Sequence, residues 1–229
     1  MKKHLVILSG AGMSQESGIR TFRDMGGLWE EYDVMEVATP EAWHRNPELV
    51  MKFYNDRRKQ LYECQPNAGH TGLAELEKYF DVDIITQNID DLHERAGSSR
   101  VLHLHGELKK ARSSVDESLI YDIDGWELKF GQLCARGSQL RPHVVWFGEA
   151  VPAMEQAIPI VEKADILVVI GTSLNVYPAA GLVNYTKSGT PIYVIDPERP
   201  SAFIRNVTFI QEKASKGVEL LKELLTKNI

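Results

Sequence analysis

Six short runs of hydrophobic residues recur along the chain of 229 residues, and most of them lack alternating polar positions. Runs rich in Val and Ile without such alternation are typical of strands that are buried on both faces of a sheet. The expected strands are Leu5–Leu8, Val82–Ile85, Val101–Leu104, Val144–Phe147, Ile166–Ile170 and Ile192–Ile195, with helical patterns at His70–Tyr79, Pro152–Lys163 and Pro178–Lys187. This alternation predicts an α/β fold with a doubly wound, mostly parallel Rossmann-like sheet of about six strands.

Two longer segments interrupt this alternation and predict a small second lobe. Residues 24–69 are charged, aromatic and mostly helical in pattern. Residues 107–141 contain hydrophobic positions that alternate on both sides of Asp124-Gly125, which predicts a hairpin. The expected pairs are Ile123 with Trp126, Tyr121 with Leu128, and Leu119 with Phe130. We expect residues 1–23, 70–106 and 142–229 to form the sheet domain, with a cleft between it and the lobe.

Composition and charge narrow the possible classes of function. Hydrophobic residues make up 43% of the chain, which is enough to fill a core, and the net charge of −6 argues against a general nucleic-acid binder. No hydrophobic run has the length of a signal peptide or a membrane span, and Cys64 and Cys134 give no disulfide framework. We therefore expect a cytoplasmic, monomeric protein without nucleic-acid or membrane partners.

A glycine-rich turn, Gly10-Ala11-Gly12-Met13-Ser14, directly follows the first expected strand. Glycines let the backbone approach a ligand closely, and the first amides of a helix favour an anion. The turn suggests a phosphate-bearing ligand, although a tight loop without a ligand is the alternative interpretation. It does not match the dehydrogenase fingerprint, because Gln15 occupies the position of the third glycine.

Polar clusters follow the other expected strands, at the edge where open α/β sheets bind ligands. They are Thr86–Asp91, His103–Glu107, Phe147–Glu149, Gly171–Ser173 and Asp196. For each cluster alone, loop capping is the better explanation, but all of them at one edge favour a polar ligand with hydroxyl and phosphate groups. His105 is the natural proton acceptor near neutral pH, although a lone histidine at a strand end is more often structural.

Taken together, these residues resemble the sirtuins, the NAD-dependent protein-lysine deacylases. The matching blocks run in family order across nearly the whole chain: Gly10–Ser14, Ser17–Arg23, Thr86–Asp90, Leu104–Gly106, Val145–Glu149 and Gly171–Pro178. The resemblance implies that the acyl group of a modified lysine passes to ADP-ribose and that nicotinamide is released. Acyl-lysine peptides and proteins are the implied partners, and NAD is the implied co-substrate.

The resemblance also assigns roles to matching positions. The NAD pyrophosphate would be cradled by Gly10, Ala11, Gly12 and Ser14, and the loop covering NAD would contribute Ile19, Phe22 and Arg23. The nicotinamide and its ribose would be lined by Gln87, Asn88, Ile89 and Asp90, with His105 as the general base. The adenosine side would be held by Gly171, Thr172, Ser173, Asp196 and Ala214. The peptide would be contacted by Val145, Phe147, Gly148, Glu149, Asn175 and Tyr177 as it pairs as a strand between the lobes.

Ala38, Tyr54 and Arg57 match the sirtuin subclass with a wide pocket for succinyl- and malonyl-lysine. Tyr54 and Arg57 are three residues apart in an expected helix and therefore share a face. A guanidinium presents a fork to a carboxylate, and a tyrosine adds a hydroxyl. Without the resemblance, a surface arginine and a packed tyrosine would be the simpler interpretation.

The chain departs from most sirtuins because it lacks the two Cys-x-x-Cys pairs that bind a structural zinc. The first pair should lie near Arg112–Val115, where there is no cysteine, and the second region keeps only Cys134. Because a structural zinc site normally has four ligands, we expect no metal, with the hydrophobic face of the hairpin as its replacement. Two alternatives to a deacylase remain: an ADP-ribosyltransferase of the same fold, and a catalytically silent NAD-binding sensor.

Overall fold

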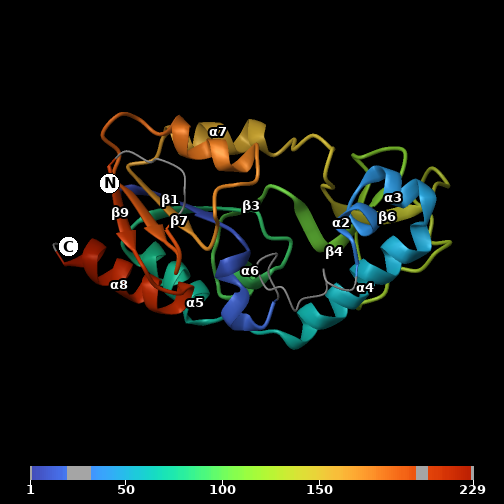
Figure 1. Ribbon diagram of the computed structural model, residues 1–229, viewed down its shortest axis with the longest axis horizontal. Helices are drawn as coiled ribbons and strands as arrows, with labels where there is room; N and C mark the ends of the chain where they lie inside the picture. Colours follow the sequence, from blue (N-terminus) through green and yellow to red (C-terminus); the bar gives the residue numbers. More distant parts are fainter. Residues whose placement is uncertain (1, 20–31, 200–205, 228–229) are drawn as a thin grey trace.

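The computed structural model describes residues 2–19, 32–199 and 206–227. A six-stranded, all-parallel sheet with the order β3-β2-β1-β7-β8-β9 forms one end of the molecule (Figure 1). Its strands are β1 His4–Ser9, β2 Asp81–Thr86, β3 Val101–His103, β7 Ile166–Ile170, β8 Ile192–Ile195 and β9 Val207–Ile210. This sheet and a second, smaller one confirm the predicted fold class, and five of the six predicted strands lie in the large sheet.

Helical segments cover both faces of this sheet, which explains why its strands lack polar alternation. On one face α5 (Ala68–Glu75), continued by the 3₁₀ turn η3 (Leu76–Lys78), packs beside α8 (Ala214–Thr226). On the other face lie α7 (Met154–Glu162) and the 3₁₀ segment η4 (Ala179–Tyr185), where a helix was predicted (Figure 1). Along β1, Leu5 and Ile7 belong to one buried core, whereas Val6 and Leu8 belong to the other.

One predicted strand is wrong and another strand was missed. Val144–Phe147 does not join the large sheet, because Val144 ends β6 (Leu140–Val144) and the next three residues form no strand. The sixth strand is instead β9, at the edge of the sheet. Only Ile210 of its four residues is buried, so this edge strand carries little of the hydrophobic signal that marks a central strand.

The strand β6 belongs to a three-stranded antiparallel sheet with the order β5-β4-β6, formed with β4 (Gly106–Ser113) and β5 (Ile120–Asp122). Beside this sheet lie α2 (Val34–Val37), α3 (Pro40–Arg45) and α4 (Pro47–Glu63), at the right of Figure 1. Each of these helices begins at a side chain that accepts a backbone N–H of its first turn, namely Asp33, Thr39 and Asn46. The short segments η1 (Ala11–Met13), η2 (Gln15–Ser17) and α6 (Leu92–Arg95) lie between the two sheets (Figure 1).

The predicted hairpin around Asp124-Gly125 is wrong. Gly125 does turn, with a φ of +74°, but β5 pairs with β4 and residues 126–130 form no strand. The side chain of Asn55 on α4 replaces the missing strand partner. Its Nδ2 donates to the Leu128 carbonyl at 3.0 Å, and its Oδ1 accepts from the Leu128 N–H at 2.9 Å. A side chain from the other insertion therefore satisfies backbone groups that the sequence pattern assigned to a hairpin.

Arg58 on the same helix completes this attachment, which we call the α4 clasp: Asn55 and Arg58 bound to the backbone of Leu108, Trp126 and Leu128. The buried Arg58 donates from Nε to the Leu108 carbonyl at 2.6 Å and from Nη1 to the Trp126 carbonyl at 2.8 Å and to Asn55 Oδ1 at 2.7 Å. Leu128 is buried as predicted, in a cluster with Met51, Ala111, Cys134 and Leu140. Trp126 and Phe130 are instead 40% and 59% exposed, so the hydrophobic face of the expected hairpin is only partly buried.

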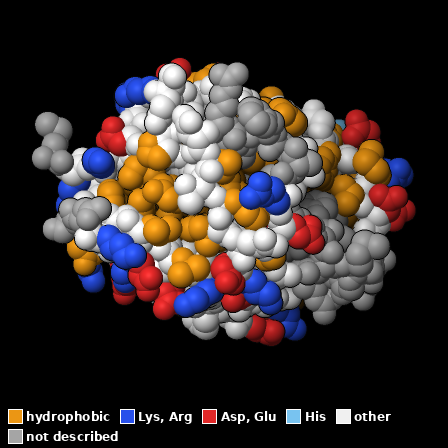
Figure 2. All heavy atoms as spheres, turned by 60° about the vertical axis from the view of Figure 1, so that its left-hand side comes forward, with side chains coloured by type: hydrophobic (Ala, Val, Ile, Leu, Met, Phe, Trp, Pro, Cys, Tyr) orange, Lys and Arg blue, Asp and Glu red, His pale blue; other side chains and the backbone are white. Residues whose placement is uncertain are grey.

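The surface carries both signs of charge. Figure 2 shows acidic and basic side chains mixed along the lower edge of one face, with hydrophobic side chains gathered nearer its centre. Among the described residues on this face, no continuous basic band of the kind that tracks a nucleic-acid backbone is visible. None of the helices in the described ranges is both long enough and apolar enough to cross a membrane.

The α4 clasp generates a stability prediction. Asn55→Ala should lower the free energy of unfolding by about 2 kcal/mol, because it leaves the Leu128 peptide and the Arg58 guanidinium with unpaired polar atoms. Urea unfolding followed by circular dichroism measures the change. The matched control is Asp56→Ala, which removes only the exposed ion pair with Lys52 and should cost less than about 0.5 kcal/mol. Equal losses in the two variants would contradict the proposed importance of the clasp.

Candidate functional site

The strand order of the large sheet has a switch point between β1 and β7, on whose two sides the chain adds its further strands in opposite directions. From β1 the chain proceeds to β2 and β3 on one side, whereas β7 leads to β8 and β9 on the other. The connections that follow β1 and β7 therefore lead to opposite sides of this point, which is where parallel α/β sheets of this order bind dinucleotides. The predicted polar clusters that follow strands of this sheet all lie at its carboxyl-terminal edge.

The glycine turn after β1 packs directly on the loop after β7. The Gly10 N–H donates to the Ile170 carbonyl at 3.0 Å, and the Gly12 N–H donates to the Gly171 carbonyl at 2.9 Å. A Cβ on Gly12 would lie 2.8 Å from the Gly171 Cα, and one on Gly171 would lie 2.3 Å from the Met13 nitrogen. The close contact between the two loops therefore requires glycine at these positions. The binding of a pyrophosphate by Gly10 and Gly12 stays a prediction.

A buried polar network joins this turn to the loop after β2. Ser14 Oγ donates to Asp90 Oδ2 at 2.9 Å, and Asn88 Nδ2 donates to Ser14 Oγ and to the Gly10 carbonyl, each at 3.1 Å. Burial raises the pKa of the Asp90 carboxyl, while hydrogen bonds from the Leu92 N–H and from Ser14 oppose this shift. Three of the predicted NAD-binding side chains are thus brought together and held in fixed orientations.

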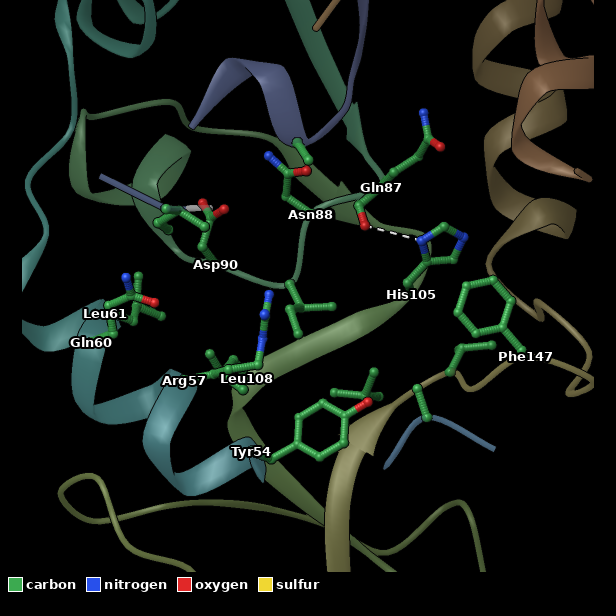
Figure 3. A pocket seen from close by; sticks show the side chains of 16 residues that line it. Tyr54, Arg57, Gln60, Leu61, Gln87, Asn88, Asp90, His105, Leu108 and Phe147 are labelled. Atoms are coloured by element: carbon green, nitrogen blue, oxygen red, sulfur yellow. Dashed lines mark hydrogen bonds between the residues drawn. The ribbon is translucent and has the colours of Figure 1, made fainter. Parts of the chain in front are cut away.

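His105 is oriented as a proton acceptor. Its Nδ1 lies 3.0 Å from the Gln87 carbonyl oxygen, which can only accept, so Nδ1 carries the proton and Nε2 keeps its lone pair (Figure 3). Burial lowers the pKa of His105, and the hydrogen bond to Gln87 opposes this shift only in part. The imidazole is therefore neutral at pH 7, with a basic nitrogen available.

His105 lines a cavity of about 160 Å³ with residues from both insertions and from the sheet edge (Figure 3). The predicted site residues in its wall are Ala11, Ile19, Ala38, Tyr54, Arg57, Gln87, Asn88, Ile89, Asp90, His105, Val145 and Phe147. Four further residues of the wall carry no sequence motif, namely Gln60, Leu61, Leu108 and Val144. Helical spacing from Arg57 could have indicated Gln60 and Leu61, which follow it by three and four positions. Leu108 had no such signal, because it depends on how β4 enters the small sheet.

Tyr54 and Arg57 extend from α4 into this cavity, opposite Gln87, Asn88 and His105 (Figure 3). Tyr54 is buried, and this burial raises its pKa to about 12, so the phenol keeps its proton. Burial lowers the pKa of Arg57, whereas the nearby Tyr54 and Asp90 raise it. A guanidinium nevertheless stays charged in proteins, so the cavity contains a fixed cation and a neutral hydroxyl.

Other predicted site residues lie outside the wall of this cavity. Those of the expected adenosine side are Gly171, Thr172, Ser173, Asp196 and Ala214, and those of the expected peptide side are Gly148, Glu149, Asn175 and Tyr177. Thr172 Oγ1 accepts a hydrogen bond from Gln87 Nε2 at 3.1 Å, which connects the expected adenosine side to the cavity wall. Glu149 binds Arg112 and Arg141 with both carboxylate oxygens, and Tyr177 is 75% exposed. Phe22 and Arg23 lie outside the described residues.

No metal-binding group stands out in the described parts of the chain. There, no group of three or more His, Cys, Asp or Glu residues is arranged to hold an ion. Cys134 Sγ lies 3.0 Å from Ser138 Oγ, and Ser138 Oγ lies 2.9 Å from Ser113 Oγ. The absence of a structural zinc stays a prediction.

Comparison with known proteins decides the family. Residues 10–178 match the Sir2 family. The chain belongs to the Sir2 family. It is 57% identical over 229 residues to an NAD-dependent protein deacylase of Bacteroides thetaiotaomicron, covering 97% of this chain and 98% of the relative. It is 55% identical over 230 residues to an NAD-dependent protein deacylase of Helicobacter pylori, covering 99% and 98%.

Solved structures of sirtuins share the fold. A Sir2 homologue in complex with NAD superposes with a TM-score of 0.89 at 40% identity, covering 99% of this chain and 90% of that one. A Sir2 variant with a deacetylated p53 peptide and 3′-O-acetyl ADP-ribose has a TM-score of 0.83 at 30% identity, covering 97% and 94%. The resemblance stated from the sequence motifs is therefore confirmed at the level of the family.

Two buried histidines lie beneath this sirtuin site. His70 and His93 are fully buried with ring centroids 4.9 Å apart, and His93 Nε2 lies 2.9 Å from Ser9 Oγ. Burial lowers the pKa of His70 to about 4 and that of His93 well below its usual value. Both rings are therefore neutral in the folded protein at pH values where the unfolded chain would bind protons.

These pKa shifts predict that acid lowers the free energy of unfolding. Between about pH 6.5 and 4 the unfolded state binds protons at positions 70 and 93 and the folded state does not, so the free energy of unfolding decreases as the pH falls. His70→Asn should reduce this slope by about 1 kcal/mol per pH unit. Urea unfolding at several pH values measures it. A His70→Asn curve that stays parallel to that of the unmodified protein would refute the assignment.

Proposed function

We propose that the protein is an NAD-dependent protein-lysine deacylase that removes acetyl, succinyl and malonyl groups and produces nicotinamide and O-acyl-ADP-ribose. The single observation that carries this proposal is that Tyr54 and Arg57 line the same cavity as His105. A cation and a hydroxyl for an acidic acyl group thus lie in one chamber with a proton acceptor. The names of the relatives support the general activity, and the cavity supports the acyl range.

The residues of the cavity and of the neighbouring loops suit NAD as a substrate. The amides of Gln87 and Asn88 and the carboxylate of Asp90 offer donors and acceptors for a nicotinamide and its ribose hydroxyls. The loop after β7, with Gly171 and Thr172, lies against the glycine turn and would continue the site toward the adenosine. Asp196 directly follows β8 at the same sheet edge, where it would accept from the adenosine ribose.

In the proposed reaction the acyl oxygen of the lysine attacks the anomeric carbon of the nicotinamide ribose, and nicotinamide leaves. His105 Nε2 then accepts the proton of a ribose hydroxyl, whose oxygen attacks the acyl carbon. The lysine amine departs with the proton that His105 had accepted, which leaves the acyl carbon bridging two ribose oxygens. Water then adds to this carbon, and the bridge opens to O-acyl-ADP-ribose with a free hydroxyl on the anomeric carbon. His105 can act in this way because the Gln87 carbonyl fixes its tautomer and burial keeps it neutral.

The peptide would enter along residues 145–148, between the sheet domain and the small lobe. This segment is held by backbone bonds from the Val145 N–H to the His105 carbonyl at 2.9 Å and from the Phe147 N–H to the Ala38 carbonyl at 3.0 Å. Phe147 is 45% exposed, so it is accessible to a partner. Because Glu149 is engaged with two arginines, we expect backbone groups near it, rather than its carboxylate, to meet the peptide.

Substitution of Arg57 tests the proposed acyl range. Arg57→Met should lower kcat/KM for a succinyl-lysine peptide by about 10- to 100-fold, because a charge-assisted bond to the acyl carboxylate is lost. The value for the acetyl-lysine peptide should change far less. Mass spectrometry of the deacylated peptide, with nicotinamide release, measures both activities.

His105→Tyr is the control for this assay and should abolish both activities. An equal loss for the two peptides in Arg57→Met would contradict the acyl range and leave the deacylase. Transfer of ADP-ribose to protein without deacylation, or no turnover of either peptide, would contradict the deacylase itself.

We also propose that the small lobe is stable without zinc. Cys64 and Cys134 are the two cysteines of the chain, which is too few for the usual ligand set. Three other interactions hold the region: the cluster around Leu128, the α4 clasp, and the ion pairs of Arg112 and Arg141 with Glu149. Elemental analysis of the purified protein should find no stoichiometric zinc, and a chelator should leave its melting temperature unchanged. One zinc per chain would contradict this proposal.

A further inference from the structure

Trp146 lies directly behind the cavity and contacts Tyr54. Both side chains are buried, with 2% and 3% of their surface exposed. The indole Nε1–H of Trp146 donates to Tyr54 Oη at 3.1 Å, and the two ring centroids are 6.5 Å apart. Trp146 is not among the residues that line the cavity, whereas Tyr54 is, so the hydrogen bond to Tyr54 links the indole to the cavity.

This hydrogen bond has a direction that matters. An indole N–H can donate but cannot accept, whereas a phenol has one proton and two lone pairs. Trp146 therefore occupies one lone pair of Tyr54 and cannot receive the Tyr54 proton. In Figure 3 the hydroxyl of Tyr54 lies at the inner end of its ring, on the side of the cavity. The proton is thus left for an acceptor other than Trp146.

We propose that Trp146 is a specificity-determining positioning residue that makes the Tyr54 hydroxyl a donor toward the acyl group. This inference rests on the proposed acyl range. An acyl carboxylate offers only acceptors, so a hydroxyl fixed as a donor favours succinyl and malonyl groups. A neutral acetyl group ends in a methyl and gains nothing from this donor. Trp146 thereby contributes to acyl selectivity without touching the acyl chain.

The indole is itself held in place on several sides. The Arg141 guanidinium lies 3.3 Å from the centroid of the Trp146 ring, and Arg141 binds Glu149 at 2.7 Å. The backbone N–H of Trp146 donates to Glu149 Oε2 at 2.8 Å. The ring of Trp43 lies 5.8 Å away on a tilted plane. The donor that faces Tyr54 therefore has little freedom to rotate away.

The test is a double-mutant cycle with Trp146→Phe and Tyr54→Phe, using succinyl- and acetyl-lysine peptides. Trp146→Phe keeps an aromatic ring and removes the N–H. It should lower the ratio of kcat/KM for succinyl over acetyl about fivefold, mainly through the KM for succinyl. In the Tyr54→Phe background the same change should have almost no further effect on the ratio. Trp43→Phe is the matched control and should leave the ratio unchanged.

A second measurement does not depend on activity. In ¹H–¹⁵N spectra of the free protein, Trp146→Phe identifies the indole signal of Trp146 by removing it. Tyr54→Phe should shift that signal, because the indole loses its acceptor. An unshifted signal would overturn the inference.

The outcomes of the cycle separate the inference from the proposed function. If Tyr54→Phe lowers the ratio but Trp146→Phe behaves as Trp43→Phe does, the acyl range stands and the positioning role fails. If Tyr54→Phe itself leaves the ratio unchanged, the acyl range and the inference fail together. Additive effects in the double variant would also overturn the inference, because Trp146 would then act independently of Tyr54.

Discussion

The site depends on helix α4, which contacts both the cavity and the backbone of the small lobe. One side of α4 presents Tyr54 and Arg57 to the cavity, and the adjoining side presents Asn55 and Arg58 to the backbone of the small lobe. Because these residues alternate within little more than one turn of the helix, the helix cannot rotate to improve one set of contacts without breaking the other. The buried guanidinium of Arg58 makes this requirement strict, since losing the partners of Nε and Nη1 would leave a charged group unpaired away from water.

The electrostatics of the cavity follow from burial. Desolvation keeps His105 neutral and Tyr54 protonated, while Arg57 stays charged because a guanidinium holds its proton in any protein environment. The same effect therefore produces a base, a donor and a cation from three different side chains. Solvent at the cavity would weaken each of these distinctions, so the packing of the lobe against the sheet domain is part of the chemistry.

The sequence predicted the sheet and the site best where the signal was local. The hydrophobic runs of β1, β2, β7 and β8, and the spacing of Tyr54 and Arg57, are properties of neighbouring residues. The hairpin failed because Asn55, more than seventy positions away, supplies the hydrogen bonds of Leu128, and no local pattern contains that information. β9 was missed because an edge strand needs few hydrophobic residues, and Leu108 was missed because its position depends on the entry of β4 into the small sheet.

The contact between the glycine turn and Gly171 has a consequence for biosynthesis. The turn precedes its partner loop, which follows β7, by roughly 160 residues. Domains form as units once their sequence has emerged from the ribosome. A nascent chain that ends before Gly171 lacks the loop on which the glycine turn packs, so this contact forms only after β7 has been made.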